Sequence, residues 1–370
     1  MADIARLPPL PHNRVTLFVR TAMPETRVNF DLIEALKETE RRFTAANPLS
    51  ERRYRQAAEA MPGGNTRTVL HYSPFPVAFR KAEGCTLTDI DGHTYTDFLG
   101  EYSAGLYGHS HPKIMAAAER ALAGGIVFGG PNENEAALAA LIIEPMMGAA
   151  GAVAADHEFL RALRAATAKH GIVMVLDEVM TSRLSPGGLQ EVIGIRPDVT
   201  TFGKYLGGGF SFGAFGGARY LMERYDPSRP ESFAHAGTFN NNVMSMAAGA
   251  VGLREIYTPE AARGLSAAGE RLKARLNAVF SERNVAMQCT GVGSLLGFHF
   301  QTTPIKRTAD IVPATEKRAL LHLELMLRGY YMARRGYVTL SLPLGEAEYD
   351  GFVQAMASVV EDYARVLREA

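Results

Sequence analysis

Two residues of this chain have the chemistry and the setting of a covalent cofactor site. Asp177 closes the apolar run 172–176, and Lys204 follows it in a glycine-rich segment. A lysine amine can form a Schiff base with an aldehyde, and a carboxylate can keep a pyridine nitrogen protonated so that the ring accepts electrons. The pair is what pyridoxal phosphate chemistry needs.

The same residues allow two other interpretations. Lys204 could be an ordinary solvated lysine, because most lysines are exposed. Asp177 and Glu178 after an apolar strand also match the Walker B pattern of nucleotide hydrolases. That reading needs a Gly-Lys-Ser/Thr loop, whereas the only Gly-Lys pair, Gly203-Lys204, is followed by Tyr205. We therefore place the nucleotide hydrolase well behind the cofactor site.

Composition sets broader limits. The 370 residues carry 39 Lys plus Arg and 39 Asp plus Glu, so no global field favours nucleic acid or an anionic membrane. The two cysteines, Cys85 and Cys289, are too few for a disulfide framework, and neither has a metal-ligand spacing. No apolar stretch approaches the ~20 residues of a spanning helix. These observations predict a cytoplasmic protein without a metal site.

The pattern along the chain predicts an α/β fold. A helix is expected over residues 30–44 after a cap at Asn29, and a hairpin across Asp91-Gly92 within residues 79–98. An amphipathic helix (158–169) leads into strand 172–176, and further short strands are expected at 199–202 and 212–216.

Four segments follow from this pattern. We expect residues 1–28 to be a disordered extension or the product of an upstream start. We expect residues 29–105 to begin a smaller domain, 106–257 to form a large domain that would bind the cofactor, and 258–370 to return to the smaller α+β domain.

Several motifs, in order, carry a resemblance. Residues 177–183 (Asp-Glu-Val-Met-Thr-Ser-Arg), 203–205 (Gly-Lys-Tyr), 235–242 (His-Ala-Gly-Thr-Phe-Asn-Asn-Asn) and 61–67 (Met-Pro-Gly-Gly-Asn-Thr-Arg) resemble class III aminotransferases of fold type I. Within that class the chain is similar to the glutamate-1-semialdehyde aminomutases and the β-amino-acid (β-phenylalanine) aminotransferases. The sequences of residues 42–48, 100–102 and 340–344 are closer to those of the β-amino-acid aminotransferases. The likeness runs from about residue 40 to the C-terminus.

The resemblance implies a site and a cofactor, pyridoxal 5′-phosphate. Lys204 would be the catalytic residue and Asp177 the partner of the ring nitrogen. Val179 or Met180 would pack on the ring, although an ordinary core contact is an equal alternative. Gly237 and Thr238 resemble the residues that contact the cofactor phosphate of the neighbouring subunit, which implies a homodimer; a helix cap is the alternative for Thr238.

Substrate recognition would use arginines, since the guanidinium fork pairs with a carboxylate at two points. Arg67 and Arg335 match positions that bind the carboxylates of the β-amino acid and the 2-oxo acid in the β-amino-acid enzymes. Because Arg334 lies next to Arg335, the sequence leaves open which of these two side chains points inward. For both Arg67 and Arg335, the alternative is an ordinary solvated surface arginine.

The resemblance also implies an internal deletion near residues 138–142. In the family, several tens of residues precede the strand that ends in Glu144-Pro145. They supply three of seven strands and a Ser-Gly-Thr loop for the cofactor phosphate. Three interpretations stay open. The first is a working aminotransferase (or aminomutase) that binds the cofactor phosphate with other residues. The second is a non-catalytic deleted homologue, and the third is the nucleotide hydrolase.

Overall fold

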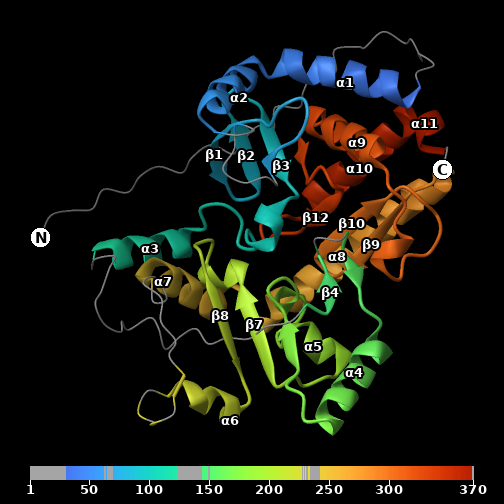
Figure 1. Ribbon diagram of the computed structural model, residues 1–370. Helices are drawn as coiled ribbons and strands as arrows, with labels where there is room; N and C mark the ends of the chain where they lie inside the picture. The colour runs from blue at the N-terminus through green and yellow to red at the C-terminus, as the bar shows by residue number, and fades with distance from the viewer. Residues whose placement is uncertain are drawn as a thin grey trace, which may run out of the picture.

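Helices and short sheets alternate along the chain, as the sequence predicted (Figure 1). The computed structural model describes residues 31–61, 64, 70–123, 144–148, 151–226, 228, 230, 232–233 and 242–368. In these ranges the strands form four sheets, in the orders β1-β2-β3-β11, β12-β10-β9, β4-β5 and β6-β7-β8. The predicted extension 1–28 and the junction near 138–142 lie outside the described residues.

The N-terminal part pairs two helices with a sheet completed from the other end of the chain. Asp31 caps α1 by accepting from the Glu34 amide at 2.9 Å, so the cap lies two residues after the expected one at Asn29. The hairpin predicted across Asp91-Gly92 is present as β2 and β3, and β3 pairs in parallel with β11. The elements are α1 (Leu32–Ala46), α2 (Pro48–Ala60), β1 (Phe79–Glu83), β2 (Thr86–Asp89), β3 (Thr94–Asp97) and β11 (Tyr330–Tyr331).

The central part contains the sheet that carries Asp177 and Lys204. Strand β6 pairs in parallel with β7, and β7 pairs antiparallel with β8. In the view of Figure 1, α4 and α5 lie to the right of this sheet, and α3 and α7 to its left. The elements are α3 (Pro112–Ala123), β4 (Met146–Met147), β5 (Val153–Ala154), α4 (His157–Lys169), β6 (Val175–Asp177), α5 (Gly188–Ile193), β7 (Val199–Gly203), β8 (Gly213–Gly217), α6 (Arg219–Met222) and α7 (Val243–Val251).

The C-terminal part packs long helices around a three-stranded antiparallel sheet. Its strand β10 is buried along its whole length and supplies the main hydrophobic cluster together with α8 and α10. Removing this apolar surface from water is the chief stabilising contribution. The elements are α8 (Pro259–Glu282), β9 (Gln288–Val292), β10 (Leu295–His299), α9 (Thr315–Leu327), β12 (Tyr337–Thr339), α10 (Glu346–Asp362) and α11 (Ala364–Arg368).

Candidate active site

Asp177 and Lys204 lie at the same edge of the β6-β7-β8 sheet. Asp177 is the last residue of β6 and stands opposite Thr201 of β7, and Lys204 follows directly after the last residue of β7. Because the two strands are parallel, their carboxyl ends meet at one edge, where α/β proteins bind ligands. The sequence prediction that these two residues converge is therefore met by the register of the strands.

The surroundings of Lys204 favour the neutral amine. Burial lowers the pKa of Lys204 to about 8; the negative charges of Glu144 and Asp177 oppose this shift, whereas Arg183 and Arg335 add to it. The Glu144 carboxylate is partly exposed, yet desolvation and the nearby charge of Asp177 raise its pKa. A lysine of lowered pKa is a better nucleophile and base near neutral pH.

A left-handed turn holds the Lys204 amine. The Nζ of Lys204 donates to the carbonyl oxygen of Tyr102 at 3.0 Å. Residues Gly100, Glu101, Tyr102 and Ser103 have consecutive φ values of 52°, 45°, 53° and 79°, and Lys204 itself has φ 56°. Left-handed backbone costs a non-glycine residue roughly 1–2 kcal/mol. Such strain persists only where surrounding contacts enforce it, and it gathers at functional sites.

Contacts on several sides enforce this turn. The Asp97 carboxylate accepts from the amides of Leu99 and Gly100 at 2.8 and 3.1 Å, and His109 Nε2 lies 2.8 Å from its other oxygen. Thr339 Oγ1 donates to the Leu99 carbonyl at 2.5 Å. A Cβ at Gly100 would lie 2.4 Å from that same Oγ1, so only glycine fits there.

The structure separates Arg335 from Arg334. The Arg335 guanidinium carbon lies 5.0 Å from the ring centre of Tyr102 and 5.8 Å from that of Tyr337, within cation–π range. Arg335 also acts on the pKa of Lys204, whereas Arg334 acts on those of the buried Tyr72 and His322. Of the two arginines, Arg335 is therefore the one that belongs with Lys204, Tyr102, Glu144 and Asp177, which we call the Lys204 cluster.

The residues after β6 divide between the site and the core. Val179 is half-buried, and its Cγ1 would lie 3.3 Å from a Cβ at Gly203, which is next to Lys204. Met180 is 6% exposed and packs in a hydrophobic cluster, against the main chain at Gly148. Glu178 is fully buried and accepts from the amides of Leu189 and Gln190 at 2.7 and 2.8 Å at the start of α5. These bonds make Glu178 a structural residue.

Three predicted site residues, Arg67, Gly237 and Thr238, lie outside the described residues. Sequence reasoning assigned no role to Tyr102, Glu144 or Arg183, which the structure brings to Lys204. The positive-φ run at Gly100 gives no pattern from which these contacts could have been predicted. Within the described ranges, no group of three His, Cys, Asp or Glu side chains could hold a metal ion.

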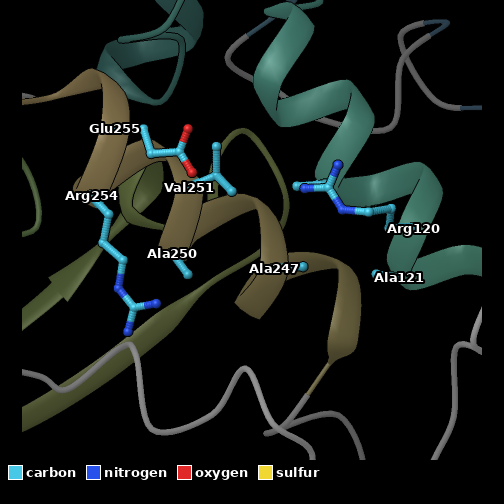
Figure 2. Close-up of a pocket in the computed structure, with 8 residues that line it drawn as sticks. Arg120, Ala121, Ala247, Ala250, Val251, Arg254 and Glu255 are labelled. Atoms are coloured by element: carbon cyan, nitrogen blue, oxygen red, sulfur yellow. The ribbon is translucent and has the colours of Figure 1, made fainter.

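A separate cavity of about 240 Å³ lies between α3 and the α7 region (Figure 2). Three charged residues, Arg120 on α3 and Arg254 and Glu255 after α7, line it together with small apolar residues. None of its lining residues belongs to the Lys204 cluster. Among the helices that the structure describes, none combines the length and the hydrophobicity that crossing a membrane requires.

Comparisons with known proteins bear on this arrangement. The model of the class III aminotransferase family matches residues 69–137 and 130–326. The β-phenylalanine transaminase of Variovorax paradoxus is 38% identical over 427 aligned positions, covering 91% of this chain and 98% of that enzyme. An uncharacterized aminotransferase of Schizosaccharomyces pombe is 37% identical, with 87% and 94% covered. A glutamate-1-semialdehyde 2,1-aminomutase of Desulfatibacillum aliphaticivorans is 27% identical, with 70% and 86% covered.

Solved structures agree. The crystal structure of the Variovorax paradoxus β-phenylalanine aminotransferase superposes with a TM-score of 0.89 at 38% identity, over 92% of this chain and all (100%) of that one. An omega-transaminase from Sphaerobacter thermophilus gives a TM-score of 0.80 at 28% identity, over 85% and 98%.

A carboxylate and a lysine of lowered pKa at the carboxyl edge of a fold type I sheet are the arrangement that an enzyme working through an aldehyde cofactor needs. The chain belongs to the class III aminotransferases. Its cofactor is pyridoxal 5′-phosphate, and the Lys204 amine, whose pKa burial lowers, and the nearby Asp177 carboxylate fit the aldehyde and the ring nitrogen of that molecule. The nucleotide hydrolase reading is wrong, and Glu178 is occupied in capping α5.

Proposed function

We propose that this aminotransferase moves the amino group of a β-amino acid to a 2-oxo acid. The observation that carries the proposal is the Lys204 amine, which the Tyr102 carbonyl holds within reach of the charges of Asp177 and Arg335. The likeness to a β-phenylalanine transaminase over most of both chains supports the choice of donor.

Each residue then has a defined task. When bound, the cofactor supplies an aldehyde that takes up the amino group and a ring that withdraws electrons from the substrate carbon. Lys204 removes the proton from the carbon that bears the amino group, which requires its neutral form. Asp177 keeps the ring nitrogen protonated. Arg335 binds a substrate carboxylate through its fork.

The remaining site assignments follow the family resemblance. Arg67 takes the second substrate carboxylate, Val179 and Met180 border the ring, and Gly237 and Thr238 reach the cofactor phosphate of a neighbouring subunit. The half-buried position of Val179 beside Gly203 supports its part, while the core position of Met180 favours a supporting one.

We further propose a homodimer in the cytoplasm, because the phosphate contact from Gly237 and Thr238 needs a second subunit. The domain division into residues 1–28, 29–105, 106–257 and 258–370 also remains a proposal. The sheet that joins β1, β2 and β3 to β11 supports grouping the second segment with the fourth.

The internal deletion near residues 138–142 is part of the proposal. The family model matches in two stretches, 69–137 and 130–326, whose ends overlap beside this point. The alignment with the Variovorax paradoxus enzyme spans 427 positions, more than the 370 residues of this chain, so it must contain gaps in this chain. A missing phosphate loop would weaken cofactor affinity, which keeps a non-catalytic homologue as the second candidate.

The test is amino transfer by the full chain in excess pyridoxal phosphate. β-Phenylalanine, α-phenylalanine and glutamate 1-semialdehyde are compared, the first two with 2-oxoglutarate or pyruvate as acceptor. We expect glutamate or alanine to form fastest from the β-amino acid. Conversion of the semialdehyde without an acceptor would establish the aminomutase instead. A cofactor absorption band without turnover of any donor would establish the non-catalytic homologue.

A further inference from the structure

Arg183 is a fully buried arginine whose bonds lead to the walls of the active site. Its side chain is 0% exposed, in the short helix η5 (Thr181–Leu184) just after Asp177. Its guanidinium donates to Ser294 Oγ at 3.1 Å, to the Ser103 carbonyl at 3.2 Å and to the Leu340 carbonyl. In the part of the chain that the structure describes, none of its hydrogen bonds reaches a carboxylate.

Burying a charge without an ionic partner destabilises the fold, which suggests that the charge of Arg183 serves the active site. A buried charge without an ionic partner loses its hydration, and arginine cannot escape the cost by giving up its proton. Each of the three guanidinium nitrogens donates one hydrogen bond to a neutral oxygen, but these bonds do not neutralise the charge. Replacing such a group with an apolar one of similar size is often neutral or stabilising.

The segments that Arg183 joins are the ones that place the reactive groups. Ser103 ends the left-handed turn in which the preceding carbonyl, that of Tyr102, accepts from Lys204. Leu340 follows β12, whose first residue, Tyr337, lies under Arg335. One side chain thus ties the acceptor of the lysine amine to the strand beside the candidate carboxylate-binding arginine.

The charge of Arg183 also reaches Lys204. After burial, which is the main cause of the lowered pKa of Lys204, Arg183 is one of two positive groups that lower it further. The other is Arg335, which is exposed and would be neutralised by a bound carboxylate. Arg183 has no such partner among the described residues, so its influence is constant during turnover.

We propose that Arg183 is a positioning residue for Lys204. It fixes the Gly100–Ser103 turn that receives the lysine amine, and its nearby positive charge favours the unprotonated form of that amine. The inference rests on the proposed role of Lys204 as the base. A purely structural arginine would stabilise the fold without changing the proton affinity of Lys204.

The experiment measures that affinity directly, in cofactor-free protein. Lys204 is acylated with a trace of acetic anhydride across a pH series, and the extent of modification is read from the peptide that contains it by mass spectrometry. We expect a midpoint near pH 8 in the native chain. In Arg183→Met the midpoint should rise, and the rate at pH 7.5 should fall by about three- to tenfold, since one pKa unit changes the free amine tenfold.

The control is Arg42→Met. Arg42 bonds the buried Glu324 in a network remote from these contacts, and it is not among the charges that act on Lys204. Its loss should lower the melting temperature without moving the Lys204 midpoint. If Arg183→Met does not melt cooperatively, Arg183→Gln, which keeps one donor group and removes the charge, takes its place.

Two results would overturn the proposal. A folded Arg183 variant with the native midpoint would make Arg183 a structural residue only. A midpoint that rises equally in Arg42→Met would assign the effect to general loosening of the fold. Neither result depends on whether the enzyme turns over, so the proposal can fail while the assigned activity stands.

Discussion

The Nζ of Lys204 donates a 3.0 Å hydrogen bond to the carbonyl oxygen of Tyr102, 102 positions earlier in the chain. Both residues have left-handed backbone, with φ values of 56° and 53°. The lysine is thus held by a main-chain acceptor, which cannot be protonated, and not by a carboxylate that would favour its charged form. Holding a base in place without charging it suits a residue that must remove a proton.

The first prediction concerns the charge balance around Lys204. Glu144 opposes the burial that lowers the Lys204 pKa, so Glu144→Gln should move that pKa below about 8. Because a lysine amine loses its proton as pH rises through its pKa, the neutral fraction at pH 7 should increase a few-fold. Acylation of Lys204 against pH measures the shift, and a midpoint that rises would contradict the assignment of Glu144.

Asp177→Asn should lower kcat by more than any loss of stability would explain. The amide cannot keep the ring nitrogen protonated, and loss of one preorganised electrostatic group costs about 10²–10³-fold in kcat. Asp198→Asn is the matched control: Asp198 precedes β7 at its opposite end and pairs with Arg164 at 2.6 Å. This control should lower the melting temperature and leave kcat within about twofold. Equal kcat losses in the two variants would argue against the role of Asp177.

The neighbouring arginines allow a paired test of substrate binding. Arg335→Met should raise KM for the carboxylate substrates by about ten- to hundredfold, the usual value of a hydrogen bond to a charged group. Arg334→Met removes the same charge from the preceding residue, which acts on the pKa values of Tyr72 and His322 and is not among the charges that act on Lys204. Steady-state kinetics should find its KM unchanged; a larger rise there would reverse the assignment.

Gly100→Ala tests the left-handed turn. A Cβ at this position would lie 2.4 Å from Thr339 Oγ1, in addition to the strain of φ 52°. Gly84→Ala carries a similar strain at φ 57° but meets nothing within 4 Å. We expect Gly84→Ala to cost about 1–2 kcal/mol of unfolding free energy, and Gly100→Ala clearly more. Denaturant unfolding measures both; equal losses would mean that the turn accommodates a methyl group.

The sequence was sufficient to predict that Asp177 and Lys204 lie at one edge of a sheet, because each comes at the end of a short strand and parallel strands align their carboxyl ends. The family motifs added the cofactor. The α/β organisation and most element positions also followed from periodicity, with shifts of one to three residues at the ends.

The rest of the site depends on contacts that no local pattern encodes. Tyr102 reaches Lys204 through a left-handed turn that neither Glu101 nor Tyr102 favours, and a local contact from Asp97 together with a tertiary contact from Thr339 imposes it. Arg183 belongs to a motif that the sequence did reveal, yet arginine is seldom buried, so its inward position could not be read from its type.

The most direct measurement is the identity of the lysine that binds the cofactor. The protein is incubated with pyridoxal 5′-phosphate, reduced with borohydride, digested and analysed by mass spectrometry. We predict that the phosphopyridoxyl mass is found on the peptide containing Lys204, and that it is absent from Lys204→Ala. Label on other lysines alone, in native protein and variant alike, would contradict the account.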